Sequence, residues 1–361
     1  MKKYYALGLV SLFTFLTVLV SISCSDNDDS DYEPISPVTV DLSAVPYPKL
    51  SDYKFFVGEM KNQVPALGVL EYEPISSLFT DYALKKRFVW MPKGVKATYN
   101  GDHEVFNFPT GSVIIKTFYY NNVLPSNTTR IIETRLLIKK ETGWIFAEYV
   151  WNAEQTEATL QMGGSFTNVQ WQDENNEVKQ TNYRIPSEAE CLTCHKINEE
   201  AVPIGPKPQN LNKSLAYTTG NQNQLAKWVQ MGYLESYPSN ITTVVNYKDE
   251  SQPLELRVRS FVDINCAHCH RAGSHCDYRP IRLAFNETTN RANLGVCVTP
   301  EEEIPGLVNI VTPANTSRSV LHYRLSTNDE QFRMPLIGRN MVYQESVEMI
   351  EQWINSLSGC N

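Results

Sequence analysis

The sequence predicts an α+β multidomain fold, in which an antiparallel β-sandwich-like domain is followed by mainly α-helical modules. Runs rich in β-branched and aromatic residues recur between residues 50 and 183, with turn residues between them at short intervals. From Ile185 onward the apolar residues follow helical spacing instead. At 361 residues the chain is also too long for one typical domain.

Three of the predicted strands are well defined by their residues. Val113–Tyr120 is β-branched and aromatic, and Arg130–Lys140 alternates apolar with polar side chains. Trp144–Trp151 follows after the short connection Glu141-Thr142-Gly143, which is typical of a hairpin. We expect this domain to be a sandwich or half-barrel of about seven or more strands.

The second half of the chain contains helix signals. Ser187 and Glu190 occupy the positions of a capping box, which predicts a short helix over the residues that follow. Asn221–Leu234 and Leu254–Ile264 have helical apolar spacing, and another helix is expected near Ser317–Leu325. The closing helix is predicted from an apolar stripe formed by Val347, Ile350, Trp353, Ile354 and Leu357.

The pattern C-x-x-C-H occurs twice in this helical region, as Cys191 to His195 and as Cys266 to His270. Haem c is attached through this pattern. Two thiols on one helical turn can reach the two vinyl groups of one porphyrin, and the next residue offers an imidazole nitrogen to the iron. A zinc knuckle, a disulfide or a redox pair would also use such cysteines, but none of them explains the histidine.

The sequence therefore predicts two covalently attached haem c groups. The residues expected to bond the porphyrins are Cys191, Cys194, Cys266 and Cys269, and the iron ligands are His195 and His270.

Methionines are the candidates for the second axial ligands. Met334 stands before Pro335 after a polar loop, and its thioether is predicted to ligate the iron of His270. A buried core methionine is the alternative, and Met341 or His322 would then be the next candidates. Met231 is the nearest thioether downstream of His195, but it fits the helix 221–234 equally well as a core residue. Met162, in the β domain, and an unligated sixth position are the other possibilities. An open position would permit ligand binding or peroxide chemistry.

Residues 1–23 have the features of an export signal: a basic start, an apolar run too short to span a bilayer comfortably, and an end at Ser23-Cys24. This end resembles a bacterial lipobox, in which the cysteine is acylated, so Cys24 is the predicted lipidation site. An ordinary cleaved signal or a loose membrane anchor is the alternative. The acidic run Ser25–Tyr32 and the prolines after it predict a solvated tether over residues 24–49. We expect a lipid-anchored protein of the cell envelope, at the outer membrane, with periplasmic or surface exposure.

Three cysteines lie outside these motifs. A disulfide between Cys276 and Cys297 closes the shortest loop and would stabilise an exported chain by about 3 kcal/mol, which leaves Cys360 as the odd thiol. An exchange of partners is the open alternative.

The chain from Leu50 to Cys360 resembles a bacterial family of di-haem c-type cytochromes of largely unestablished role. Besides the two haem motifs, the matching pieces are Leu78–Phe88, Phe108–Gly111, Tyr149–Asn152, Ile185–Ser187 and Gln209–Asn212. The resemblance implies haem c binding and electron transfer, and it supplies no substrate. We expect residues 50–183 to be the β domain, 184–250 the first haem module, and 251–361 a second module of cytochrome c type with a class I-like order of elements.

These features favour an electron-transfer protein or redox subunit that serves an unidentified partner protein. A haem enzyme of the peroxidase type that uses an open iron is the first alternative. The second is a binding module, in which the β domain recognises a ligand and the haem part supplies electrons. The formal net charge of −8 argues against nucleic acid as a partner.

Overall fold

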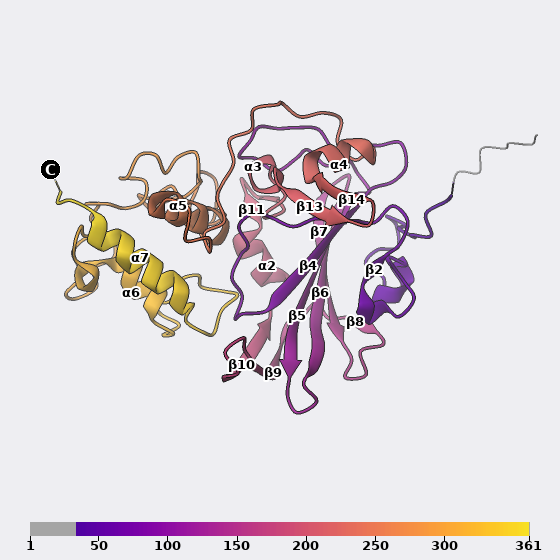
Figure 1. Ribbon diagram of the computed structural model, residues 1–361, viewed down its shortest axis with the longest axis horizontal. Helices are drawn as coiled ribbons and strands as arrows, with labels where there is room; N and C mark the ends of the chain where they lie inside the picture. Colours follow the sequence, from indigo (N-terminus) through magenta and orange to yellow (C-terminus); the bar gives the residue numbers. More distant parts are fainter. Residues whose placement is uncertain (1–33, 361) are drawn as a thin grey trace, which may run out of the picture. The chain divides into compact units, whose positions relative to one another are not determined.

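An antiparallel sheet of eight strands is the largest element of the computed structural model, which describes residues 34–360 (Figure 1). Its main path runs β10-β9-β5-β6-β7-β8, while β4 pairs with β5 and β3 pairs with β4. The three strands predicted with defined ranges are present as β5, β6 and β7. The bounds are β3 Leu70–Glu71, β4 Leu84–Trp90, β5 Val113–Val123, β6 Thr128–Lys140, β7 Gly143–Trp151, β8 Ala158–Leu160, β9 Ser165–Gln172 and β10 Val178–Ile185.

One face of the sheet packs against the chain that precedes β3. This chain contains two short 3-10 helices, η1 (Leu50–Tyr53) and η2 (Met60–Asn62), and the strands β1 (Phe56–Val57) and β2 (Val64–Pro65). Val45 is buried in the shared core, which also contains Leu50, Tyr53, Phe88, Ile115, Leu136 and Tyr149. Val45 thus belongs to this core although it falls within residues 24–49, for which a tether was predicted.

The opposite face packs against α2 (Glu188–Cys194), α3 (Pro208–Leu211) and α4 (Gln224–Gln230). Side chains of the sheet and of these helices form one core, with Ile114, Leu137, Phe146, Cys191, Leu211, Leu225 and Trp228 among its members. The segment predicted as a first haem module therefore shares its core with the sheet.

The prediction of a β-sandwich is wrong, because helices and loops cover the sheet and no second large sheet faces it within residues 34–360. The other sheets of this range are the two-stranded pairs β1–β2, β11–β12 (Lys196–Ile197, Glu200–Ala201) and β13–β14 (Ser214–Tyr217, Gly220–Asn223). Alternation along a strand shows that a face is buried, but it does not show whether a sheet or helices cover that face.

The prediction of mainly α-helical haem domains is also wrong. Strands account for 26% and helices for 18% of the described chain, which contains six α-helices. Three of these are α5 (Leu254–Asn265), α6 (Val320–Ser326) and α7 (Gln344–Ser356), which Figure 1 shows gathered together. Between α5 and the 3-10 helix η3 (Thr316–Arg318) the chain forms a succession of turns and contains no helix or strand. The predicted helices exist, but the loops between them are longer than the helices.

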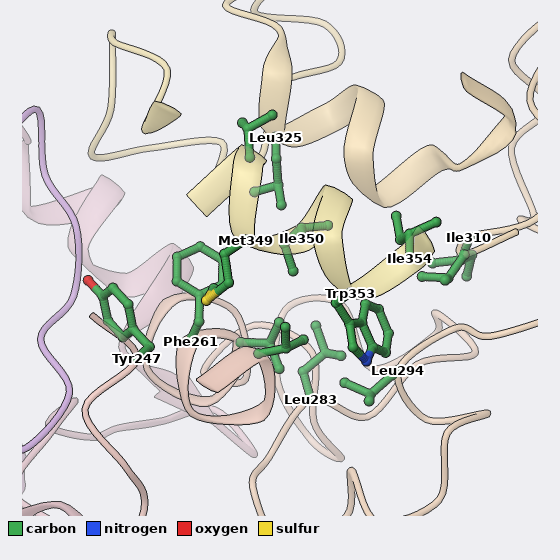
Figure 2. Packing of buried hydrophobic residues seen from close by; sticks show 14 of the residues in the cluster. Tyr247, Phe261, Leu283, Leu294, Ile310, Leu325, Met349, Ile350, Trp353 and Ile354 are labelled. Carbon is green, nitrogen blue, oxygen red and sulfur yellow. The ribbon is translucent and has the colours of Figure 1, made fainter. Parts of the chain in front are cut away.

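A separate hydrophobic core holds this last part of the chain together. Phe261 of α5, Leu325 of α6, and Ile350 and Trp353 of α7 meet in it, together with residues from the long connection such as Leu283, Leu294 and Ile310 (Figure 2). The loops are thus fixed by apolar side chains that they contribute to the helical core.

Local sequence signals set the ends of the helices. The Glu190 carboxylate accepts a hydrogen bond from the Ser187 backbone N–H (2.9 Å), as expected at the start of α2. α5 coincides with its prediction except for one added residue. α4 begins only at Gln224, because Gly220–Asn223 pair in β14 and the Asn223 side chain caps the helix by accepting from Leu225 N (2.9 Å).

Replacement of Trp353 by alanine is expected to destabilise the protein by about 3–5 kcal/mol, since a large buried side chain leaves a cavity. Trp353 is 1% exposed, and its Nε1 donates to a Glu255 carboxylate oxygen (2.9 Å). Denaturant-induced unfolding gives the change in free energy. Trp353→Phe is the matched control, because it keeps most of the volume and loses only this hydrogen bond. A Trp353→Ala protein no less stable than Trp353→Phe would contradict the expectation.

Cys24 and the predicted export signal lie outside the described residues. Within residues 34–360, no helix combines the length and the apolar character that a membrane span requires.

Candidate functional site

The two C-x-x-C-H motifs meet in space. Cys191 and Cys194 belong to α2, whereas the second motif follows directly after α5. The sulfur of Cys194 lies 3.8 Å from the sulfur of Cys269, although 75 residues separate them in the sequence. The sequence predicted two separate modules and gave no sign of this proximity.

Buried polar side chains fix the end of α5 from which the second motif leaves. The Asn265 side chain accepts from Phe79 N (2.8 Å), and the Asp263 carboxylate accepts from Phe285 N (3.0 Å) and from the Gln209 side chain (3.0 Å). Both residues are almost fully buried. The contacts with Phe79 and Gln209 join the end of α5 to the earlier part of the chain, and the contact with Phe285 joins it to the connection that follows.

The second motif lines a mostly apolar cavity with about 1040 Å³ of unfilled space, the open mouth included. Cys266, Cys269 and His270 lie in its wall, and so does Met334, the predicted second ligand. Apolar side chains complete the wall, among them Ile281, Leu283, Ile310, Leu321 and Leu325. The structure thus brings together every residue that the sequence assigned to this haem.

The chemistry of this cavity fits a porphyrin. Burial lowers the pKa of His270 to about 4, so its imidazole is neutral and can ligate iron. Its Nδ1 is buried and has no hydrogen-bond partner within the described residues. Two thiols at the right spacing, a neutral imidazole and a thioether in one apolar cavity are the donor set of a c-type haem.

The first motif is buried against the sheet. The Cys191 thiol donates to a Glu148 carboxylate oxygen of β7 (3.0 Å), and burial raises the pKa of this thiol. His195 Nδ1 lies 2.8 Å from the backbone oxygen of Val202, and the imidazole packs edge-on against Phe146. When Nδ1 donates to this carbonyl, Nε2 carries a free lone pair, as is usual for a histidine that ligates metal. Burial lowers the pKa of His195 to about 3, which keeps the ring neutral.

Met231 is exposed at the C-terminal end of α4. Met231 follows the last residue of α4, is 37% exposed, and lies in the wall of neither large cavity described for the molecule. Of the two readings that the sequence left open, the buried core position is not observed, and ligation of the first iron stays a prediction.

Another donor set is present where the motifs meet. One ligand atom each from Cys194, His268 and Cys269 lie within 4.8 Å of one another. A hydrogen bond from Cys269 holds the pKa of Cys194 well below its usual range, whereas the same contact raises the pKa of Cys269. Two sulfurs and an imidazole are ligands that Zn²⁺ also accepts, with a fourth still to be supplied. His268 was missed from the sequence, because it occupies a variable position inside the motif.

The predicted disulfide between Cys276 and Cys297 is wrong. Cys297 is bonded to Cys360, with a Cα–Cα distance of 5.7 Å, and Cys276 is a free buried thiol. The shortest-loop argument failed because Cys276 faces the cavity of the second motif, where its backbone N–H donates to the Cys269 oxygen (3.0 Å). The chain after α7 brings Cys360 back to Cys297.

Comparison with protein-family models, with curated proteins and with solved structures gave no match for this chain.

Proposed function

We propose that the protein is an exported di-haem c-type cytochrome that transfers electrons through two covalently bound haems. One observation carries this proposal: the two C-x-x-C-H motifs converge until the sulfurs of Cys194 and Cys269 are 3.8 Å apart. In a c-type haem each sulfur is bonded to the carbon of a former vinyl group at the porphyrin edge. Cys194 and Cys269 would therefore hold the two haems close together, and an electron could pass between them within one chain.

Each residue of the site has a defined part in this proposal. Haem iron supplies a one-electron redox couple when the groups are bound. Cys191 with Cys194 and Cys266 with Cys269 retain the two haems covalently, which prevents their loss outside the cytoplasm. His195 and His270 would supply the imidazole ligands of the two irons, and the apolar side chains around Met334 would limit the access of water to the second iron.

The proposal includes a place in the cell and a partner. Acylation of Cys24 would anchor the chain to the cell envelope, and more than one acyl chain is needed for stable anchoring. An electron carrier in this position serves a redox partner protein. We infer no nucleic-acid partner, in line with the acidic composition.

A potentiometric titration of the full-length exported protein tests the electron-transfer proposal. Two reversible one-electron steps are expected, one for each haem. A protein that shows haem absorbance but only one reducible iron would contradict the proposed role of the motif pair.

A second candidate function follows from the position of Met231. Because this thioether is 37% exposed, the first iron can lack a protein sixth ligand and bind a small molecule or peroxide. Carbon monoxide added to the reduced protein distinguishes the two functions. A carrier with two six-coordinate irons leaves its spectrum unchanged, whereas an open first iron gives a new carbon monoxide spectrum.

The Met334→Ala protein is expected to keep both haems, because the thioether bonds and His270 are untouched. Its reduced spectrum should gain carbon monoxide binding at the iron of His270, and the potential of that haem should fall. Met334→Leu conserves volume and should cost less than about 1.5 kcal/mol, so it separates ligation from packing. A Met334→Leu spectrum identical to that of the natural protein would rule out ligation and direct attention to Met341 or His322.

A further inference from the structure

Three cations lie side by side across the centre of the sheet. Arg87 of β4 is paired in register with Lys116 of β5, and Lys116 is paired with Arg135 of β6. Residues directly opposite each other share a face of the sheet, and like charges in this position destabilise it. Lys85 lies two residues before Arg87 and so projects from the same face.

Three of these four cations lie over one aromatic ring. The ammonium groups of Lys116 and Lys85 lie 4.8 Å and 5.7 Å from the ring centre of Phe118, and the Arg135 guanidinium carbon lies 4.4 Å from it. Contacts of this kind compensate a desolvated cation only in part. Burial lowers the pKa of Lys116 well below its usual range, and Arg87 and Arg135 lower it further.

The carboxylates nearby are already engaged. Glu133 receives two hydrogen bonds from Arg135 (2.9 and 2.6 Å) and a third from Tyr183 (2.7 Å). Glu148 accepts from Cys191 and lies 3.7 Å from Arg135, with one strand between it and Lys116. Arg135 is therefore the ion-pair partner of both carboxylates, Glu133 and Glu148.

The cation group, which we define as Lys85, Arg87 and Lys116, has no carboxylate within ion-pair range among residues 34–360. Lys85 donates only to a backbone oxygen, that of Ala83 (2.8 Å), and Arg87 donates to the Ser77 hydroxyl (2.7 Å). Arg87 is 7% exposed. Lys85 and Lys116 are half-buried. Cations withdrawn from water are ordinarily paired, so this group lacks an anion.

The cation group lies beside the first motif. Glu148, which holds the Cys191 thiol, is in register with Arg135, the neighbour of Lys116. A porphyrin bonded to Cys191 and Cys194 and ligated by His195 would therefore lie next to these cations.

From this arrangement the geometry points to an anion site formed by Lys85, Arg87 and Lys116, whose ligand is the pair of propionate carboxylates of the haem on Cys191 and Cys194. Carboxylates match the missing charge, and the site lies on the sheet rather than on the helix that carries the motif. The inference rests on the proposed function, because it requires a haem at the first motif.

Lys116→Met in the full-length di-haem protein tests the site. Loss of a cation near the iron favours the ferric state, so the midpoint potential of one haem is expected to fall while the other is unchanged. The resonance Raman band of the haem propionates should shift at the same time. Lys116→Arg keeps the charge and should restore both signals towards those of the natural protein.

Lys86→Met is the matched control. Lys86 lies between Lys85 and Arg87 on β4 and projects from the opposite face, so its loss removes the same charge without touching the site. If Lys116→Met yields too little folded protein, Lys85→Met replaces it with the same expected downward shift.

The outcomes separate the two proposals. A preparation without haem contradicts the proposed function itself. Two haems whose potentials and Raman bands are unchanged by Lys116→Met, or changed equally by Lys86→Met, overturn the anion site. A potential that depends on added inorganic phosphate in the natural protein also overturns it, because the ligand would then be a free anion.

Discussion

The chain that carries Cys266→Ala and Cys269→Ala, exported with a c-type maturation system, is expected to retain one covalent haem instead of two. Both sulfurs line the cavity that also contains His270 and Met334, and without them no thioether can form there. Intact-mass measurement should show the loss of the mass of one haem. The remaining haem is the one on Cys191 and Cys194.

Cys276→Ala is the control for this change. Cys276 is a buried free thiol in the wall of the same cavity, but it lies outside the motif. Its replacement should leave two haems. If the double variant keeps two haems, or if Cys276→Ala loses one, the assignment of the thioether bonds is wrong.

Loss of the disulfide between Cys297 and Cys360 is expected to destabilise the protein by about 4 kcal/mol, according to the chain-entropy model for a large closed loop. The bond links residues 63 apart in the sequence and ties the end of the chain to the loop-rich connection. Denaturant unfolding of the Cys297→Ala, Cys360→Ala double variant measures the change.

The pairing itself is tested by the single variants. Cys297→Ala and Cys360→Ala should destabilise the protein to a similar extent, and Cys276→Ala should leave the disulfide intact. If Cys360→Ala is stable and Cys276→Ala is strongly destabilised, the account is contradicted. The disulfide would then be the pair with the shorter loop, Cys276–Cys297.

Local patterns predicted the elements of this fold, but not what covers them. β5, β6 and β7 were found because β-branched and alternating residues mark strands, and α5 because its apolar residues have helical spacing. The single sheet was missed, since a buried face looks the same whether a sheet or helices cover it. The length of the loops around α6 and α7 was missed because apolar loop residues such as Leu294 and Ile310 enter the core without periodicity.

The same limit applies to the site. The spacing of C-x-x-C-H defines each motif completely within five residues, so the sequence identifies both. The 3.8 Å approach of Cys194 to Cys269, the partnership of Cys191 with Glu148, and the cation group depend on strand register and helix packing. No spacing along the chain encodes these contacts, because they join residues from distant segments.

Haem and zinc content of the natural full-length protein, exported with a c-type maturation system, tests the central claim most directly. The pyridine haemochrome assay and metal analysis on one preparation give both values per chain. The account predicts two covalent haems and no zinc, with Cys194 and Cys269 both bonded to porphyrin. A folded protein that carries zinc on Cys194, His268 and Cys269 and no haem would contradict it.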